Sequence, residues 1–239
     1  MPMPAPAIDL DIDDGVYYPS SDGKPMAETP DHVACMVSIF QTLETHFRTR
    51  PDVYVAINMN WYWEKGNRKA RRDPDVMVIP GVVQKDRNSF RSWNEGGALP
   101  AVCFEMASQK TWKNNLGKAK DDYEAQGVKE YFIFDPRFQF LETPLLGFRL
   151  RKGHYVAIPE EADGSLLSRQ LGLSVLPEGL SLRFIDRNIG QPILTKDEQI
   201  EREYQRAEQE RQRADSLAVE VDRLRRMLAE SGTAPNGAH

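Results

Sequence analysis

The sequence predicts an α+β protein that ends in one long charged helix, and three patterns support this class. Apolar residues between Val33 and Phe47 recur at helical spacing, whereas apolar and polar residues alternate with a period of two over residues 53–59. Residues 196–230 contain neither Pro nor Gly, and charges of both signs alternate along them. The chain of 239 residues is long enough for one sizeable core or two small ones. We therefore expect helices and short strands ahead of an exposed terminal helix.

The composition is that of a globular protein and contains no candidate membrane span. The chain is 40% hydrophobic and 28% charged, and none of its apolar runs approaches the roughly 18 residues that a spanning helix requires. Residues 1–15 are rich in Pro and Asp and lack the basic and apolar regions of a secretory signal. We therefore expect a cytoplasmic protein that does not contact membranes.

The net charge argues against a strongly basic nucleic-acid-binding protein, and the cysteines argue against a zinc-binding or disulfide-rich protein. A formal net charge of -5 disfavours a strong nonspecific attraction for nucleic acid, although the basic segment 66–73 could bind phosphate groups locally. Cys35 and Cys103 lie in apolar segments without the spacing of a zinc site or of a disulfide framework. Both cysteines are expected in the core.

The first helix is expected to begin at residue 30. Thr29 can cap it, and Pro30 fits the first helical position because its missing N–H needs no partner there. The helical spacing predicts one buried face, which comprises Val33, Val37, Phe40, Leu43 and Phe47.

Short β-like runs follow the first helix. A second helix is expected at residues 115–126, with Gly127 as its C-terminal cap. Pro136 stops the strand that comes after this helix. The alternation and the turn residues predict strands at 53–59, 76–79, 101–107 and 130–135, and shorter ones at 138–141, 147–151, 154–158, 172–176 and 180–185.

A break in composition near Thr195 separates the terminal helix from the rest of the chain. We expect an N-terminal arm at residues 1–16, a main domain at 17–195, the charged helix at 196–230 and a disordered end at 231–239. The helix either stays solvated or forms a homodimer as a coiled coil, which usually needs three to four heptads. Its apolar residues are spaced 3, 4, 3, 4, as in a heptad seam, and are Ala214, Leu217, Val221, Leu224 and Leu228.

Two acidic residues stand on predicted strands rather than on loops. Asp75 begins one apolar strand and Glu105 lies inside another, so rigid elements carry both. Because alternate residues share a face of a strand, Glu105 is expected beside Cys103 and opposite Phe104 and Met106. A carboxylate in apolar surroundings is costly to bury unpaired, and a divalent cation such as Mg²⁺ would be a suitable partner. The structural alternative is a glutamate that faces solvent or pairs with an arginine.

The helix after the Glu105 strand supplies a candidate lysine. Leu116 and Tyr123 define its buried stripe. Lys120 flanks that stripe and is expected to reach back toward Glu105, whereas Lys118 lies on the exposed side. Two acids and a lysine suit metal-assisted hydrolysis of a phosphodiester, because the acids hold the ion and the lysine orients water and offsets developing charge. A lysine beside a buried stripe can also simply extend along the surface.

Six blocks occur in one order over about residues 17–185: YPSSDGKPMAETPDH, DVYVAINMNWYWEKGN, DPDVMVIPGV, FEMAS, GVKEYFIFDP and PLLGFRLRKGHYV. Together they resemble the Uma-type ("Uma two") restriction endonuclease family, which is placed in the PD-(D/E)XK nuclease superfamily. The resemblance implies a restriction-endonuclease-like fold in which helices flank a mixed β-sheet. It also implies a divalent-metal-dependent endonuclease with Mg²⁺ or Mn²⁺ as cofactor and nucleic acid, above all DNA, as partner.

The resemblance assigns the acids. Pro74 and Asp75 match the family's Pro-Asp pair, and Glu105 matches its second acid. Glu28 and His32 match the acid and the histidine near the start of the family's first helix, so they are candidates to extend the metal site. For His32 the alternative is an ordinary hydrogen bond at a helix end.

The family's lysine has no direct match. The lysine of the superfamily signature would fall at Ala107, and the position on the following helix that this family uses is Ala119. Either Lys120 or Lys118 serves in its place, or the chain is a catalytically impaired module. Such a module would bind nucleic acid or protein and oligomerise through its C-terminal helix.

Two groups of basic residues are candidates for nucleic-acid contact. One follows the aromatic cluster at residues 61–63, and the other lies near Glu105. Packing of an edge strand beside a solvated turn is the alternative explanation of the first group. The candidates are Arg68, Lys69, Arg71 and Arg72 in the first group, and Lys110 and Lys113 in the second.

Overall fold

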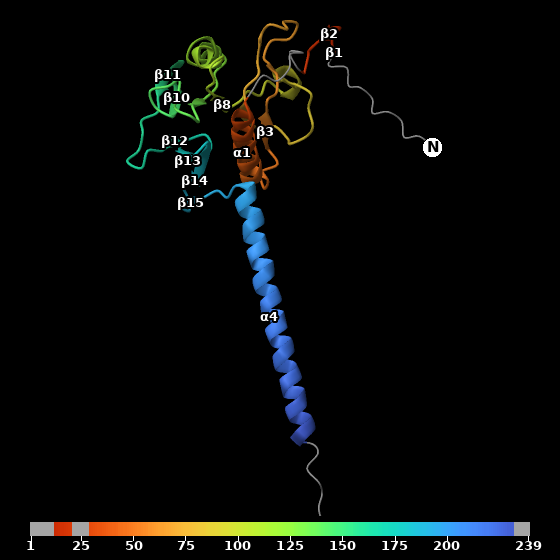
Figure 1. Ribbon diagram of the computed structural model, residues 1–239. Coiled ribbons are helices and arrows are strands. Elements are labelled where there is room, and N and C mark those ends of the chain that lie inside the picture. Colours follow the sequence, from red (N-terminus) through yellow and green to blue (C-terminus); the bar gives the residue numbers. More distant parts are fainter. Residues whose placement is uncertain (1–11, 21–28, 232–239) are drawn as a thin grey trace, which may run out of the picture. The chain divides into compact units, whose positions relative to one another are not determined.

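The computed structural model describes residues 12–20 and 29–231, with side chains described up to residue 229 (Figure 1). The chain divides into two compact units, Met1–Ile193 and Leu194–His239. The first unit contains all of the described strands, and the described part of the second unit is dominated by one helix. The predicted succession of a mixed α and β region and a long terminal helix is confirmed.

A six-stranded mixed sheet forms the centre of the first unit. Its strand order is β11-β10-β9-β8-β6-β3, in which β8 and β9 are parallel and the other neighbours are antiparallel. Four of the strands are buried over nearly their whole length, which explains their continuous apolar sequences. The strands are β3 (Val53–Ile57), β6 (Val76–Pro80), β8 (Val102–Met106), β9 (Glu130–Phe134), β10 (Leu145–Arg151) and β11 (His154–Ala157).

Helix α1 (Pro30–Phe47) covers one face of this sheet. The side-chain oxygen of Thr29 accepts a hydrogen bond from the backbone N–H of His32 at 3.3 Å, and Pro30 opens the first turn, as predicted. This cap fixes the residue at which the helix starts. It thereby also fixes the position of His32 in the first turn.

The buried face of α1 differs in part from the predicted one. Leu43 and Phe47 are buried, but Val33, Val37 and Phe40 remain partly exposed. The prediction left out Cys and Met, which are as frequently buried as the branched aliphatic residues. The face that packs against the sheet is Cys35, Met36, Ile39, Leu43 and Phe47, and it meets Val55, Val78 and Phe104 in one core cluster.

The opposite face of the sheet carries the predicted second helix in three pieces. They are α2 (Trp112–Asn114), the wide π-type turn η2 (Asn115–Ala119) and α3 (Lys120–Ala125). Gly117 departs from helical dihedrals within η2, with φ -107° and ψ -109°. Gly127 follows α3 with φ 81°, as expected of a glycine that ends a helix. Tyr123 of α3 packs on this face in a second core cluster with Cys103 and Tyr131.

Smaller sheets complete the first unit. The four-stranded sheet contributes Leu173, Val175 and Phe184 to the core beneath α1. A three-stranded sheet includes one parallel pair, β4 with β7. The remaining elements are β1 (Ile12–Asp13), β2 (Val16–Tyr17), β4 (Trp61–Tyr62), β5 (Arg71–Arg72), β7 (Phe90–Arg91), η1 (Ser92–Glu95), β12 (Leu166–Ser168), β13 (Leu173–Glu178), β14 (Ser181–Asp186) and β15 (Gln191–Pro192).

The strand predicted at residues 138–141 is wrong. The carboxylate of Asp135 accepts hydrogen bonds from the backbone N–H groups of Phe140 at 2.6 Å and Leu141 at 3.0 Å. These bonds hold the segment as a compact turn, in which Phe138 takes a positive φ of 50°. The backbone donors that a strand would need are therefore occupied by a local side chain.

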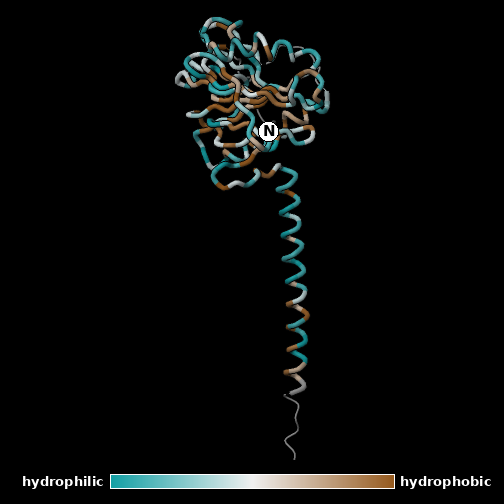
Figure 2. The backbone as a smooth tube through the Cα atoms, turned by 90° about the vertical axis from the view of Figure 1, so that its left-hand side faces the viewer, coloured by the Kyte–Doolittle hydropathy of each residue, from teal (hydrophilic) through white to brown (hydrophobic). Residues whose placement is uncertain are grey.

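The second unit contains helix α4 (Lys196–Ser231), as predicted. Thr195 and Glu198 form a reciprocal cap, in which the N–H of Thr195 donates to Glu198 Oε2 at 2.8 Å and the N–H of Glu198 donates to Thr195 Oγ1 at 3.3 Å. Apolar side chains toward the C-terminal end remain exposed, Leu217 by 66% and Leu228 by 71%. Figure 2 shows brown, hydrophobic segments toward the C-terminal end of a largely hydrophilic helix.

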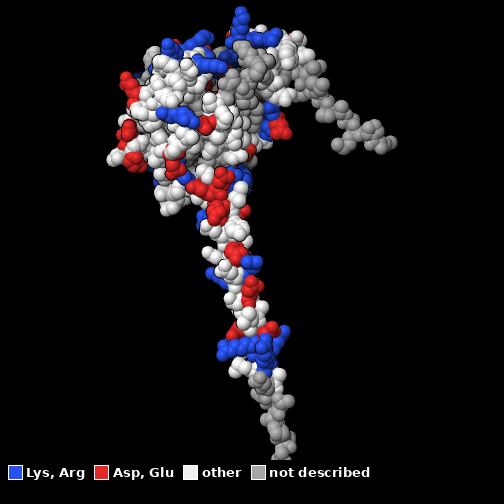
Figure 3. Space-filling model, viewed as in Figure 1, with Lys and Arg blue, Asp and Glu red and all other residues white. Residues whose placement is uncertain are grey.

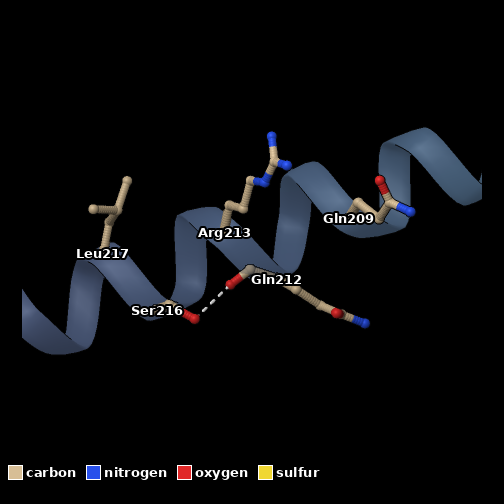
Figure 4. A pocket seen from close by; sticks show the side chains of 5 residues that line it. All are labelled: Gln209, Gln212, Arg213, Ser216 and Leu217. Atoms are coloured by element: carbon tan, nitrogen blue, oxygen red, sulfur yellow. Dashed lines mark hydrogen bonds between the residues drawn. The ribbon is translucent and has the colours of Figure 1, made fainter.

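A shallow groove on α4 is lined by Gln209, Gln212, Arg213, Ser216 and Leu217 (Figure 4). The Ser216 hydroxyl donates a hydrogen bond to the backbone carbonyl of Gln212 at 2.8 Å. Because one helix supplies all five side chains, the groove is open surface. None of the helices in the described residues carries a stretch apolar enough to cross a membrane.

Candidate functional site

The sheet register brings the two predicted acids together. Strands β6 and β8 are antiparallel, with Val76 opposite Phe104 and Met77 opposite Cys103. Asp75 directly precedes β6, so continuation of this register places it opposite Glu105. The two carboxyl groups therefore lie on neighbouring strands at one end of the sheet.

Asp75 is buried and held in one orientation. Its Oδ2 accepts a 2.6 Å hydrogen bond from the backbone N–H of Met106, and its Oδ1 lies 3.3 Å from His32 Nε2. Asp75 and His32 are each 7% exposed. These two contacts fix the orientation of the Asp75 carboxylate at the end of the sheet.

Glu105 is in a different electrostatic environment. The Tyr123 hydroxyl donates a 2.6 Å hydrogen bond to Glu105 Oε1. Burial raises the pKa of Glu105 well above its usual range, and the charge of Asp75 raises it further, against smaller lowering effects of Tyr123 and Arg72. The side chain nevertheless remains partly exposed. In the described part of the chain, neither Asp75 nor Glu105 forms an ion pair with Lys or Arg.

This pair has the chemistry of a hard-cation site. The charge of Asp75 disfavours ionisation of Glu105, and a divalent cation between the two carboxyl groups would remove that penalty. Mg²⁺ commonly takes one or two protein carboxylates and completes its shell with water and phosphate oxygens. The residues described here contain no group of three or more His, Cys, Asp or Glu side chains arranged around one point. Asp75 and Glu105 thus fit as two ligands, with His32 behind Asp75; Glu28 lies outside the described residues.

Comparison with known proteins assigns the chain to a family. Residues 8–183 match the family described as "Uma2: Putative restriction endonuclease". The chain belongs to this family. A solved structure titled as a putative nuclease belonging to DUF820, from Anabaena variabilis ATCC 29413, is 15% identical, with a TM-score of 0.44 over 62% of this chain and 76% of that chain. A search of curated proteins gave no match.

The lysines predicted for the Uma2 site do not meet the acids in this structure. Lys120 Nζ lies over the ring of Phe148 at 4.4 Å from its centre, on β10, which β9 separates from β8. Lys118 extends into solvent and lies 3.6 Å from Asp122 Oδ2. The space beside Glu105 is occupied by Tyr123. Ala119, at the family's lysine position, is buried and 1% exposed.

The predicted nucleic-acid-contact residues divide into exposed and packed groups. Arg71 donates to the Tyr62 hydroxyl at 3.1 Å, and Arg72 is paired with Asp122. Trp61 and Tyr62 are fully buried, so they offer no stacking surface. Figure 3 shows Lys and Arg gathered at the upper end of the first unit, near the orange loop that follows β3 in Figure 1. The exposed basic residues are Arg68, Lys69, Lys110 and Lys113, of which Arg68 lies 5.9 Å from the Tyr17 ring and Lys113 5.3 Å from the Trp112 ring.

Two contacts of the site were not predicted: that of Tyr123 with Glu105 and that of Asp122 with Arg72. Tyr123 was identified only as part of a buried stripe, and Asp122 was not considered. A buried tyrosine hydroxyl usually requires a polar partner, and Glu105 was a polar residue on the facing strand. That requirement was a usable signal for Tyr123. Nothing in the local sequence indicated that Asp122 would bind Arg72, which lies fifty residues earlier.

Proposed function

We propose that this Uma2-family protein is a divalent-metal-dependent endonuclease that hydrolyses phosphodiester bonds, with DNA as its substrate. Family membership supports nuclease activity. The metal requirement is supported by one observation above all: Asp75 and Glu105 lie opposite each other and neither pairs with a Lys or Arg among the described residues. Mg²⁺ or Mn²⁺ is the proposed cofactor because both acids offer hard oxygen ligands.

The chain's own residues divide the work of holding such an ion. Asp75 would bind it through a carboxylate that Met106 N–H and His32 keep oriented, and Glu105 through a carboxylate oriented by Tyr123. Because the pKa of Glu105 is raised, binding of the ion is coupled to loss of a proton up to a higher pH than at an exposed glutamate. Once bound, the ion supplies Lewis acidity toward the phosphate and lowers the pKa of a bound water. Glu28 is a further proposed ligand, on the strength of its motif match.

Cleavage of supercoiled and linear DNA with Mg²⁺ or Mn²⁺ tests this proposal. We expect cutting by the natural protein, and its loss in Asp75→Asn and Glu105→Gln. Glu142 is an exposed acid, and Glu142→Gln is a matched control that should cut normally. Undiminished cutting by both site variants would refute the assignment, and cutting of RNA alone would refute the choice of substrate.

Four exposed basic residues are proposed to contact the backbone of the nucleic acid: Arg68, Lys69, Lys110 and Lys113. Their support is exposure and charge. Neutralising Arg68 with Lys69, or Lys110 with Lys113, should weaken DNA binding and reduce the salt dependence of the binding constant, because fewer counterions are then released. An unchanged salt slope in fluorescence anisotropy would remove these residues from the interface.

A second candidate function is a catalytically impaired module that binds nucleic acid or protein. The specific observation in its favour is Ala119, which is buried on the face that carries Glu105. Ala119→Lys restores the family's lysine at this position. A clear gain of cleavage in this variant would support impairment of the natural site, whereas loss or no change would favour the endonuclease as it stands.

We also propose that α4 forms a homodimeric coiled coil. Support comes from the 3, 4, 3, 4 spacing of apolar residues and from the exposure of Leu217, Leu224 and Leu228 by 66%, 49% and 71%. Removal of residues 196–239 should convert a dimer into a monomer in light scattering and leave the melting temperature of the first unit unchanged. A full-length chain that is monomeric at high concentration would contradict this proposal.

A further inference from the structure

Arg72 is fixed beside the acid pair by an ion pair with Asp122. Its Nε and Nη2 both donate to Asp122 Oδ2, at 2.8 and 2.6 Å, and its side chain is 14% exposed. Arg72 precedes Asp75 by three residues, and Asp122 directly precedes Tyr123, which binds Glu105. The ion pair therefore joins the segment that leads into Asp75 to the helix whose Tyr123 binds Glu105.

The contacts at the site distinguish Arg72 from the other nearby cations. Arg72 binds Asp122, and the hydroxyl of the next residue, Tyr123, binds Glu105. Lys118 also approaches Asp122, at 3.6 Å, but its side chain is 77% exposed. Lys120 is engaged with Phe148. Of these three cations, Arg72 alone is both largely buried and held by two charge-assisted hydrogen bonds.

The guanidinium of Arg72 retains capacity for an anion. It carries five N–H donors, of which Asp122 engages two in the structure. Its charge persists at every pH at which the fold exists, and its planar shape suits two oxygens of one phosphate. An arginine that is already ordered loses less conformational entropy on binding than a mobile surface lysine does.

We propose that Arg72 binds the phosphate group that is cut and stabilises the charge that develops on it, while Asp122 positions Arg72. This inference rests on the proposed endonuclease function and supplies the cation that Ala119 does not. In the hydrolysis, the oxygen of water bonds to phosphorus, the bond to one sugar oxygen breaks, and a proton of the water ends on that oxygen. Arg72 makes and breaks no covalent bond, and its role is electrostatic.

The test compares Arg72→Met with Arg187→Met. Arg187 also pairs with a carboxylate, Glu161, at 2.8 Å, but belongs to the turn after β14. The two variants therefore lose the same charge. We expect kcat for DNA cleavage to fall roughly 100- to 1,000-fold in Arg72→Met, with a smaller change in KM, since the lost contact strengthens in the transition state. Arg187→Met should cut normally, and both variants should still bind Mn²⁺ in calorimetry, with a change of affinity in Arg72→Met that is far smaller than its loss of kcat.

Two further variants cover the case in which Arg72→Met does not fold. Arg72→Lys keeps a cation that can pair with Asp122 and should lower kcat at least tenfold, because the forked geometry is lost. Asp122→Asn keeps Arg72 but loosens it, and should lower kcat less than removal of Arg72 does. Circular dichroism melting identifies the folded variants.

The outcomes separate this inference from the proposed function. Normal kcat in folded Arg72→Met or Arg72→Lys, together with inactive Asp75→Asn, would overturn the role of Arg72 and leave the endonuclease standing. A natural protein that binds no Mn²⁺ and cuts no DNA would overturn both. Loss of Mn²⁺ binding in Arg72→Met would also contradict the inference, since it assigns Arg72 to the phosphate.

Discussion

Two glutamates at opposite ends of neighbouring strands in the central sheet differ in how the fold compensates their charge. Glu130 begins β9 and pairs in register with Val102, whereas Glu105 lies near the end of the parallel strand β8. Glu130 is fully buried, yet both of its carboxylate oxygens are satisfied. Its donors are Arg149 Nε at 2.8 Å, Ser168 Oγ at 2.5 Å, and the backbone N–H groups of Arg169 at 3.0 Å and Gln170 at 3.3 Å.

Glu105 has no comparable set of partners. Among the described residues, its side chain accepts a hydrogen bond from the Tyr123 hydroxyl. Burial raises its pKa, and the charge of Asp75 raises it further. A buried carboxylate is tolerated when ion pairs and hydrogen bonds compensate its lost hydration. The Glu130 cluster provides that compensation internally and stabilises the fold. The carboxyl groups of Asp75 and Glu105 lack such internal compensation, and an external cation could provide it. This lack of compensation is typical of a binding site.

The largest expected effect is on cleavage by Glu105→Gln, which should lose activity without losing stability. Glu105→Gln should lower kcat for DNA cleavage by at least about 100-fold, because a metal ligand contributes several kcal/mol to the transition state. The same change removes a group whose charged form is disfavoured by the fold, so the free energy of unfolding without metal should stay equal or rise. Cleavage rates and urea denaturation measure the two effects. A clear loss of stability together with full activity would show that Glu105 has a structural role and is not a metal ligand.

Glu130→Ala should have the opposite signature. The change leaves Arg149, whose side chain is 11% exposed, without its carboxylate, and should lower the free energy of unfolding by about 3–5 kcal/mol. Mn²⁺ affinity of the folded fraction should be unchanged. Glu178→Ala is a control, because the Glu178 side chain is 57% exposed and its pair with Arg183 should contribute at most about 1 kcal/mol. Similar urea midpoints for the two variants would show that the Glu130 cluster is not stabilising.

The pH dependence of stability should distinguish the natural protein from Glu105→Gln. The pKa of Glu105 is raised in the folded state, from about 4.3 in the unfolded chain. The folded form therefore holds this proton more tightly, and the penalty is absent below about pH 4.3. It grows by at most about 1.4 kcal/mol per pH unit as the pH rises toward the folded-state pKa. Without metal, the advantage of Glu105→Gln in urea denaturation should widen over this range; a constant difference would contradict the raised pKa.

Tyr123→Phe should have the smallest effect of the set. The hydrogen bond from Tyr123 lowers the pKa of Glu105, so its loss should raise that pKa further and weaken Mn²⁺ binding at neutral pH by roughly tenfold. Stability should change by about 1 kcal/mol. Tyr155→Phe is a suitable control, because that hydroxyl donates to the carbonyl of Val128 at 3.0 Å and not to an acid. Equal Mn²⁺ affinity in the two variants would remove Tyr123 from the site.

The sequence predicted the strands well where burial dictated continuous apolar runs, as in β6, β8 and β9. It failed at residues 138–141, where the Asp135 side chain captures backbone donors and apolar content alone misleads. The acids could be placed because strand alternation has a fixed period. The position of Lys120 could not be predicted in this way. The expected buried stripe was set from Leu116, which precedes the non-helical Gly117 in η2. A π-type turn changes which face of the helix every later residue occupies. The Glu130 cluster depends on residues far apart in the chain and left no local signal.

A calorimetric titration with Mn²⁺ tests the central claim most directly. It compares the natural protein with Glu105→Gln near neutral pH, in two buffers that differ in ionisation enthalpy. We predict binding by the natural protein and a large loss of affinity in Glu105→Gln. The heat should depend on the buffer to the extent that Glu105 is still protonated before the ion binds. Absence of binding at millimolar Mn²⁺, or equal affinity in the two proteins, would contradict the proposal that Asp75 and Glu105 share a divalent cation.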